Sequence, residues 1–485
     1  MLDPFSLLPL ALAAHDGHVD EHEVQQLVAA GLTLLQRSAT LVRALSGKRA
    51  AVLLPTSPGF FTALAACEGR GAVLINPLAA PPEITHQLRD ANVGAVFTNT
   101  TLAAGLPADV PYVLLDEAPR AARIVADGRT RDVDLGSHAG LRIAGDTDVV
   151  GRDDEAAIVY TSAMAGIPLG AVLSHRNLLS NARATVEAAG GIADDSVLAV
   201  LPFAHLFGLS VTAAAPLLAG GRVITMARFN PTRAAELLES GEITAIAAVP
   251  AVFRAVLAML ERKTESSVGR LRLCICGGSP LDRVLQDRWF DATGVELRQG
   301  YGLTEAGPVC LFNRVDVPNV RGSLGVPFPG VEVSLRTPIP YDEAGHALPV
   351  DRIVESNEGE ICVRGDNVFR GYVANGERGL PLRDGWLHTG DLGKRDAAGH
   401  IAFAGVVKPM FTRNGFNIYP HEIEHVVATC PGVDAAKVRE VVVPDRESEI
   451  SLEVVSSISA DDVKRWCADR LSAYKQPAAI AMRND

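Results

Sequence analysis

The sequence predicts an α/β protein with a large N-terminal domain of layered, parallel-type sheets and a small barrel-like subdomain. A small C-terminal α+β domain follows. The chain has 485 residues, which is too long for one ordinary core. Apolar runs alternate with helical patterns over the first two thirds, which is typical of βαβ units. After about residue 330 short strands separated by turn residues replace this pattern. We expect an N-terminal domain at 1–404, with its barrel-like part at about 325–404, and a C-terminal domain at 405–485.

The strands expected in the N-terminal domain are short apolar runs bounded by turn residues. Amphipathic patterns between them predict helices, and two clear ones span 81–91 and 231–240. The expected strands are 50–55, 72–76, 95–99, 112–116, 156–161, 197–202, 222–226, 245–250 and 272–278.

The last third predicts two further groups of elements. Short strands at 330–338, 359–365, 371–375 and 400–405 form the expected barrel-like part. The C-terminal domain then reads as a β-hairpin, a helix, two strands and a last helix. The sequence SADD at Ser459 is a typical capped helix start with acids in the first turn. These C-terminal elements are expected at 419–430, 437–444, 449–457 and 459–474.

Composition and charge exclude several classes of protein. The net charge of −12 argues against nucleic acid as a partner, because phosphate backbones require a basic face. None of the seven cysteines forms a C-x-x-C pair, so we expect buried apolar cysteines in a reducing, cytoplasmic location. The N-terminus lacks a basic region, so no signal peptide is expected, and no run of about 18 apolar residues predicts membrane insertion.

The stretch YTSAMAGIPLG, from Tyr160 to Gly170, lies between an expected strand and the start of a further strand and helix. Loops rich in Gly, Ser and Thr at such a position cradle phosphates with backbone N–H groups and hydroxyls. Here Ala163, Met164, Ala165 and Leu169 stand where glycine, hydroxyls and a cation would serve that chemistry. The loop therefore has the position of a phosphate loop without most of its phosphate-binding groups.

Further motifs follow in a definite order along the chain. They are LPFAHLFGL (201–209), GGSPL (277–281), QGYGLTEAGP (299–308), GWLHTGDLG (385–393) and NGFNIYPHEIE (414–424). Each is weak alone, since TGD before a strand is often only a turn. Together, and in this order, they resemble the acyl-adenylate-forming superfamily, which includes acyl-CoA and aryl-CoA ligases, peptide-synthetase adenylation domains and luciferase.

The resemblance implies a two-step reaction. A small carboxylic acid and ATP form an acyl-adenylate and pyrophosphate, with Mg²⁺ as the metal. The small domain then rotates, and a thiol displaces AMP to give a thioester. The thiol is CoA or the phosphopantetheine of an acyl or peptidyl carrier protein. The protein supplies alignment and cations for the phosphates.

The same resemblance assigns roles to residues of this chain. As catalytic residues it gives His205, between the acyl pocket and the thiol tunnel, Thr304, at the α-phosphate or acyl carboxylate, and Glu305, which would also hold Mg²⁺. The nucleotide site would comprise Gly277, Gly278, Ser279, Tyr301, Gly302 and Asp391, with Tyr301 stacked on adenine and Asp391 on the ribose hydroxyls. The acyl pocket would include Phe207, Gly208 and Val249, with Lys408 at the hinge and Gly415 in the thiol tunnel. Thr161, Ser162 and Gly166 remain from the degenerate phosphate loop.

Several of these residues also admit a purely structural role. His205 lies among apolar residues and suits a core histidine, and Tyr301 suits a core tyrosine. Glu305 suits an acid at a helix N-terminus, and Lys408 suits a solvated surface lysine. The mixed apolar and small residues expected around the acyl group allow either an aromatic acid or a medium-length aliphatic one.

The chain departs from the family pattern at three places, and all weaken the handling of triphosphate. The first is the phosphate loop, where each lost charge-assisted contact is worth about 1.5–3 kcal/mol. The second is the hinge, where Val406 replaces an arginine and Pro409 follows Lys408. The third is the C-terminus, where AAIAMRND carries no lysine in a PxxxxGK segment, and Lys475 is in a different motif.

Three functions remain open from the sequence. The first is an acyl- or aryl-CoA-ligase-like enzyme with impaired ATP-dependent adenylation, which moves acyl groups between CoA and carrier-protein pantetheine. The second is a conventional ATP-dependent acid–thiol ligase, in which a cation such as Arg176 compensates for the loop. The third is a non-catalytic homologue that senses a ligand or binds a partner.

Overall fold

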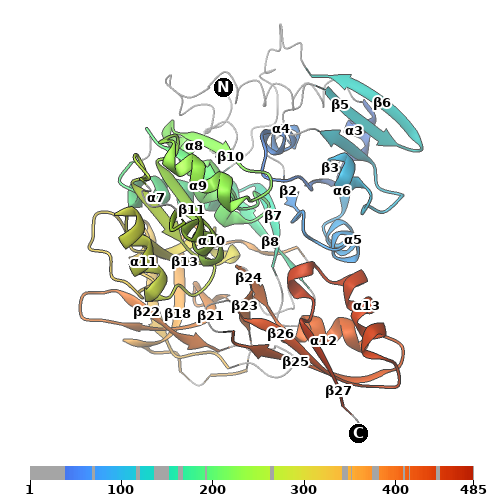
Figure 1. Cartoon of the computed structure of the whole chain (residues 1–485). Helices are drawn as coiled ribbons and strands as arrows, with labels where there is room; N and C mark the ends of the chain where they lie inside the picture. The colour runs from blue at the N-terminus through green and yellow to red at the C-terminus, as the bar shows by residue number, and fades with distance from the viewer. Residues whose placement is uncertain are drawn as a thin grey trace.

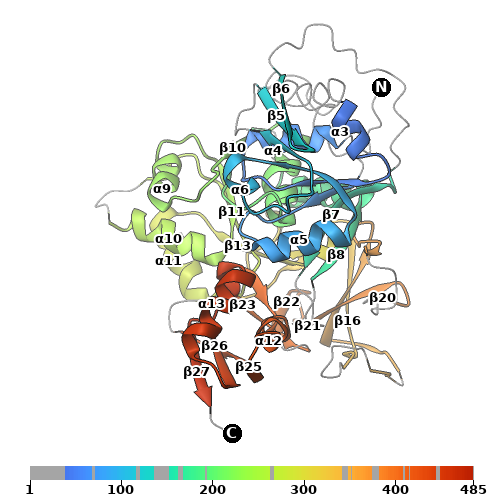
Figure 2. The same cartoon turned by 90° about the vertical axis from the view of Figure 1, so that its right-hand side faces the viewer.

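The computed structural model of the chain describes most of the residues after the first 38. The described ranges are 39–67, 71–115, 121–135, 152–161, 168–191, 194–262, 267–340, 348–350, 352–373, 382–407, 410–413, 415–443 and 448–483. Figures 1 and 2 show two sheet-and-helix layers, an antiparallel sheet beside them, and the C-terminal elements packed below.

The first sheet has the strand order β19-β8-β7-β2-β1-β3-β4-β5-β6. Its centre is parallel, and its ends, from β4 to β6 and from β7 to β19, are antiparallel. The expected parallel strands are confirmed at the centre, where both faces are covered. The strands are Arg49–Val52 (β1), Ala72–Leu74 (β2), Val93–Thr98 (β3), Tyr112–Leu115 (β4), Ala121–Ala126 (β5), Arg129–Asp134 (β6), Glu155–Thr161 (β7), Leu169–Ser174 (β8) and Gly371–Tyr372 (β19). The helices beside them are Ala39–Ala44 (α3), Pro58–Ala66 (α4), Pro81–Asp90 (α5) and Thr100–Ala103 (α6).

The second sheet has the order β10-β9-β11-β12-β13-β14-β15, parallel up to β13 and antiparallel beyond it. All residues of β11 and β12 are buried, as is usual for parallel strands covered on both faces. The strands are Ser196–Ala199 (β9), Arg222–Thr225 (β10), Ala245–Ala248 (β11), Leu273–Cys276 (β12), Leu297–Gly302 (β13), Val309–Phe312 (β14) and Val326–Pro327 (β15). The α-helices are His175–Ala188 (α7), Ala215–Ala219 (α8), Pro231–Glu239 (α9), Pro250–Leu260 (α10) and Arg283–Thr293 (α11), with a π-helix at Phe207–Ala214 (η1) and a 3-10 turn at Thr304–Ala306 (η2).

The third sheet is antiparallel, with the order β17-β16-β18-β21-β20 and with β22 beside β21. It corresponds to the region predicted as barrel-like, except that the strand expected at 371–375 is β19, which pairs with β8 in the first sheet. In the described residues the pairing order of the third sheet is open rather than closed into a ring. Its strands are Val331–Arg336 (β16), Glu355–Ser356 (β17), Glu358–Gly365 (β18), Leu382–Arg383 (β20), Trp386–Arg395 (β21) and Ile401–Val406 (β22). The boundary placed at residue 405 stays a prediction, and it lies inside β22.

The C-terminal elements form their own hydrophobic cluster, which includes Phe411, Ile423, Leu452 and Leu471. Ser459 caps the last α-helix as expected, with Asp462 completing the capping box. The elements are Phe411–Arg413 (β23), Phe416–Ile418 (β24), Pro420–Ala428 (α12), Val433–Val441 (β25), Glu449–Ser456 (β26), Ala460–Arg470 (α13), a 3-10 turn at Ala473–Lys475 (η3) and Ala479–Arg483 (β27). We call the β23–β24 pair the C-terminal hairpin.

Three details at the C-terminus differ from the sequence prediction. Strand β25 begins before residue 437, because its pairing with β26 runs from Val433 to Val441. Helix α13 ends at Arg470, where Leu471 adopts an extended backbone. The sequence after Gln476 was not predicted as a strand, yet β27 pairs in parallel with β26. The described residues contain no helix that is both long and apolar enough to cross a membrane.

Candidate functional site

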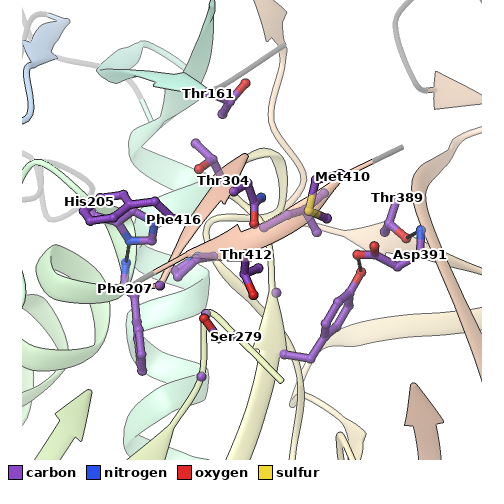
Figure 3. A pocket seen from close by; sticks show the side chains of 18 of the residues that line it. Thr161, His205, Phe207, Ser279, Thr304, Thr389, Asp391, Met410, Thr412 and Phe416 are labelled. Carbon is purple, nitrogen blue, oxygen red and sulfur yellow. Dashed lines mark hydrogen bonds between the residues drawn. The ribbon is translucent and has the colours of Figure 1, made fainter. Parts of the chain in front are cut away.

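A cavity of about 790 Å³ lies where β12 and β13 end and the C-terminal hairpin begins. In parallel sheets, ligands characteristically bind beyond the carboxyl ends of the strands. The loop after β12 contributes Gly277, Gly278 and Ser279, and the end of β13 contributes Tyr301 and Gly302. Figure 3 shows side chains converging on this cavity from both sheets, from β21 and from the hairpin.

The loop after β12 presents backbone rather than side chains to the cavity. A Cβ atom on Gly277 would lie 3.1 Å from the carbonyl oxygen of Gly300, and Gly278 has a φ of +79°. Such a loop allows a flat ligand to approach the backbone closely. The hydroxyl of Ser279 is buried and has no hydrogen-bond partner among the described residues, so it is suited to a polar ligand atom.

Tyr301 and Asp391 meet across the cavity although they are distant in sequence. The Tyr301 hydroxyl donates to Oδ2 of Asp391 at 2.7 Å, and the Asp391 backbone N–H donates to the Thr389 hydroxyl at 3.1 Å. Burial, followed by the negative charge of Asp391, raises the pKa of Tyr301. The phenol therefore stays protonated and acts as a donor that orients the carboxylate (Figure 3).

Glu305 lies on η2 between the first and second sheets. Its Oε1 accepts from the hydroxyl of Tyr372 at 2.9 Å and from that of Thr161 at 3.4 Å. Thr161 ends the strand that precedes the phosphate loop, and Thr304 lines the cavity beside it. This group of oxygen atoms suits Mg²⁺, which prefers oxygen ligands. Tyr372 was not predicted, because its contact depends on the pairing of β19 with β8.

His205 precedes the π-helix and lies half-buried in the cavity wall. Its Nδ1 accepts a hydrogen bond from the backbone N–H of Phe207 at 3.2 Å. Because a backbone amide can only donate, Nδ1 is the unprotonated nitrogen and the ring proton lies on Nε2. Burial lowers the pKa of His205 to about 4, so the ring is neutral at physiological pH.

The C-terminal hairpin closes the cavity opposite the loop after β12, the glycine loop with Gly277 and Gly278. Met410, Thr412 and Phe416 line it, together with His205 and Ser279, and Figure 3 labels all five around the cavity. A Cβ atom on Gly415 would lie 2.5 Å from Cγ1 of Val249, and Gly415 has a φ of +80°. The hairpin can therefore reach this depth only with glycine at that position.

The cationic side chains that line the described part of the cavity are Arg254 and Lys475, and both are neutralised. Arg254 pairs with Asp282 at 2.6 Å. Lys475 Nζ lies 2.8 Å from Glu83 Oε1 and 2.5 Å from Glu422 Oε1. No sequence pattern indicated the Lys475 cluster, because its members come from segments far apart in the chain.

A second cluster, formed by Glu360 and Cys362 of β18 and His388 of β21, brings three potential metal ligands together. Its contacts are those of a structural group. Glu360 accepts from His388 Nδ1 at 2.8 Å and from the backbone N–H groups of Ile339 and Gly390. Burial also raises the pKa of the Cys362 thiol, which opposes thiolate formation. We therefore assign the trio to anchoring the strand that carries Asp391.

Most of the residues assigned by resemblance line this one cavity, but several do not. Gly208 and Val249 are not among the described lining residues, and their assignment to the acyl pocket stays a prediction. A Cβ on Gly208 would lie 2.3 Å from the Pro202 carbonyl oxygen, so Gly208 packs the π-helix against the backbone. Val249 packs against Gly278 and Gly415.

Ser162, Gly166 and Lys408 lie outside the described residues. The residues that do line the cavity are Thr161, His205, Phe207, Gly277, Gly278, Ser279, Tyr301, Gly302, Thr304, Glu305, Asp391 and Gly415.

Arg176 does not supply the missing phosphate cation in this structure. Its guanidinium forms two hydrogen bonds with the carboxylate of Asp153, at 2.6 and 2.8 Å, and it is not among the described residues lining the cavity. It stands at the start of α7.

Comparisons with solved structures agree with this fold. A malonyl-CoA ligase solved as a ternary product complex with methylmalonyl-CoA and AMP has a TM-score of 0.76 and 26% identity, over 95% of this chain and 93% of that one. The o-succinylbenzoate CoA synthetase of Bacillus subtilis has a TM-score of 0.75 and 24% identity, over 95% of this chain and 89% of that one, and supports the fold alone.

Sequence comparisons give the family. A feruloyl-CoA synthase of Amycolatopsis sp is 33% identical over 451 residues, which are 90% of this chain and 84% of that protein. The 4-coumarate–CoA ligase 1 of Oryza sativa subsp. japonica is 31% identical over 452 residues, 87% of this chain and 77% of that protein. The sequence model of the AMP-binding enzyme family matches residues 35–373. The chain is therefore a member of the AMP-binding enzyme family, the acyl-adenylate-forming superfamily, with acyl-CoA ligases among its relatives.

Proposed function

We propose that this enzyme works mainly on the thioester side of the family reaction, with weak ATP-dependent adenylation. It passes an acyl group from the thioester of CoA to a second thiol, which is either another CoA or the pantetheine of a carrier protein. The acyl group passes through an acyl-AMP bound in the cavity. The carrying observation is the charge of the cavity. Arg254 and Lys475 are both neutralised by carboxylates, while Glu305 and Asp391 also line it. Such a lining suits a monophosphate far better than a triphosphate of higher charge.

The proposed exchange balances without ATP. An oxygen of the AMP phosphate attacks the thioester carbonyl, the C–S bond breaks, and the CoA thiolate takes a proton from solvent. The incoming thiolate, whose proton has passed to solvent, then attacks the acyl-AMP carbonyl, the C–O bond breaks, and AMP is regenerated. AMP is thus required in catalytic amounts, and pyrophosphate takes no part. The two steps are one half-reaction of the family, run in both directions.

The protein's contribution to this exchange is orientation and hydrogen bonding. Asp391, oriented by Tyr301, holds the ribose hydroxyls, and the glycine loop with Ser279 receives the adenine. His205 cannot accept a proton at Nε2, since that nitrogen already carries one; its Nε2–H instead donates to oxygen at the acyl centre. The seated C-terminal hairpin brings the thiol to this point.

Mg²⁺ has a limited role in this proposal. Glu305 would hold it with help from the hydroxyl of Thr161, and the bound metal would neutralise phosphate charge. The acyl group itself would lie against apolar residues such as Val211, Ile275 and Phe312. Aryl acids are the first substrates to test, because the feruloyl-CoA synthase and 4-coumarate–CoA ligase relatives are named for them.

The test compares two assays on the same protein. Feruloyl-CoA and free pantetheine are mixed with and without AMP, and feruloyl-pantetheine is measured. We expect transfer that depends on AMP and is unaffected by removing ATP. In parallel, ferulate, Mg·ATP and CoA are mixed, and feruloyl-CoA is measured. Formation at rates near 10 s⁻¹, the middle of the range for enzymes, would overturn the proposal of weak adenylation. If feruloyl-CoA gives no transfer, a panel of aliphatic acyl-CoAs shows whether the acid was chosen wrongly or the proposed reaction does not occur.

The second candidate is a conventional ATP-dependent acid–CoA ligase. The observation that favours it is the 33% identity to a feruloyl-CoA synthase over 90% of this chain. It requires a source of positive charge beyond the described lining residues. Rapid ATP-dependent thioester formation in the second assay is the result that would establish it.

A further inference from the structure

A buried group of charges joins the C-terminal elements to α5 at the edge of the cavity. The Lys475 side chain is only 6% exposed and lies between the carboxylates of Glu83 and Glu422. The hydroxyl of Ser472 also donates to Glu83. Lys475, Glu422 and Ser472 all belong to the C-terminal elements, and only Glu83 comes from the N-terminal part. The nearby negative charges raise the pKa of Lys475 against its burial, so it remains a cation.

Glu83 is held in place by its own helix before Lys475 reaches it. Its Oε2 accepts from the backbone N–H of Ala80 at 2.7 Å, which caps the start of α5. The same helix is fixed to both sides of the phosphate loop. His86 Nε2 lies 3.1 Å from the Pro168 carbonyl, and Asp90 accepts from Tyr160 at 2.6 Å. Helix α5 is therefore held by hydrogen bonds to both flanks of the phosphate loop. Glu83 is a residue through which this helix contacts the C-terminal elements.

The contact reaches the cavity through one neighbouring residue. Tyr474 precedes Lys475, and its ring stacks on Phe416 with centroids 4.1 Å apart and an interplanar angle of 17°. Arg413 also donates to the carbonyls of Tyr474 and Gln476. Both Arg413 and Phe416 belong to the C-terminal hairpin, and Phe416 lines the same cavity as His205. The path thus runs from Glu83 through Lys475 and Tyr474 to the hairpin.

We propose that Glu83 is a positioning residue for thiol transfer: by binding Lys475 and Ser472 it seats the Tyr474–Phe416 stack and the C-terminal hairpin in the cavity. The inference rests on the proposed thiol-transfer function for its kinetic consequence. Glu422 keeps Lys475 paired even when Glu83 is removed, because both lie in the C-terminal elements. Loss of the Glu83 charge therefore weakens the contact that holds the hairpin in the cavity, but it does not leave the buried lysine unpaired.

The test uses Glu83→Gln in the full chain, because glutamine can still accept from the Ala80 amide and cap α5. Hydrogen exchange of residues 411–418 is measured together with exchange of residues 81–90. We expect at least fivefold faster exchange in the hairpin and unchanged exchange in α5. The matched control is Glu332→Gln, which removes an exposed carboxylate paired with Arg364 on the third sheet. It should change neither segment.

The kinetic arm measures CoA thioester formation from synthetic feruloyl-AMP. Glu83→Gln should lower the maximal rate at least tenfold while the affinity for AMP, measured by calorimetry, changes less than twofold. Unchanged hairpin exchange in the variant would overturn the positioning role, whatever the activity. If the wild type makes no thioester but Glu83→Gln still speeds hairpin exchange, the positioning role of Glu83 stands and the proposed function is overturned.

If Glu83→Gln does not fold, Ser472→Ala tests the same contact from the other side. This variant should accelerate hairpin exchange at least twofold, and no change would overturn the positioning role.

Discussion

Tyr301 holds Asp391 through a hydrogen bond of 2.7 Å between residues that are 90 positions apart in the chain. An ionised carboxylate has about four acceptor positions, so Asp391 can keep this bond and still accept from two ribose hydroxyls. The Tyr301 hydroxyl therefore acts by fixing the direction of the carboxylate, in addition to any stacking of its ring on adenine.

Replacing Tyr301 with Phe separates these two effects. The ring remains, while Asp391 loses a buried donor, and hydrogen bonds to charged groups contribute about 1.5–3 kcal/mol. We expect AMP to bind at least tenfold more weakly, measured by calorimetry. Tyr112→Phe, on β4 of the first sheet, is the control and should leave AMP binding unchanged. Equal affinity of Tyr301→Phe and wild type would show that Asp391 needs no such orientation.

Replacing Gly415 with Ala tests whether the hairpin must reach its present depth. The new Cβ would lie 2.5 Å from Val249, at a φ of +80°. We expect thioester formation from feruloyl-AMP to fall at least tenfold, and AMP affinity to change by less than threefold. Gly399→Ala is the matched control, because it has a φ of +90° and nothing within 4 Å of the added Cβ. A similar loss in both variants would point to general backbone strain rather than to the hairpin.

The sequence predicted the parts of this protein that local patterns encode. Alternation of apolar runs and helical patterns predicted the central strands of both large sheets, and the short motifs placed Gly277, Tyr301, Glu305 and Asp391, all of which line one cavity. These motifs are informative because glycine, a donor or a carboxylate at a strand end each has few structural roles.

The sequence could not predict contacts that only the assembled fold creates. Lys475 and Glu83 are 392 positions apart, and no local pattern links a lysine after α13 with a helix cap in the first sheet. The acyl-pocket assignment of Gly208 stays a prediction for a similar reason. A glycine in an apolar run cannot show whether it faces a ligand or packs against backbone, and the structure places the Pro202 carbonyl there.

The protonation of His205 predicts a pH dependence of stability. Its folded pKa of about 4 lies below the ordinary value of 6.5, so the folded state binds fewer protons than the unfolded state between these values. The contribution of His205 is therefore fully present above pH 6.5 and is lost as pH falls toward 4. Between pH 8 and pH 4.5 the wild type should lose about 2.5 kcal/mol relative to His205→Gln, measured by urea unfolding. A constant difference between the two proteins would mean that His205 titrates normally.

Restoring the phosphate loop is the most direct test of why adenylation should be weak. Leu169 occupies the first position of β8, opposite Thr161 at the end of β7, so a lysine there would stand at the mouth of the loop. A charge-assisted contact to a phosphate contributes about 1.5–3 kcal/mol. We therefore expect Leu169→Lys to raise ATP–pyrophosphate exchange at least tenfold, and further with Ala163→Gly, Met164→Thr and Ala165→Thr. Leu169→Met, of similar size and without charge, is the control. If the full set of substitutions leaves the exchange unchanged, the lost loop groups do not limit adenylation, and the hinge residue Val406 is the next position to test.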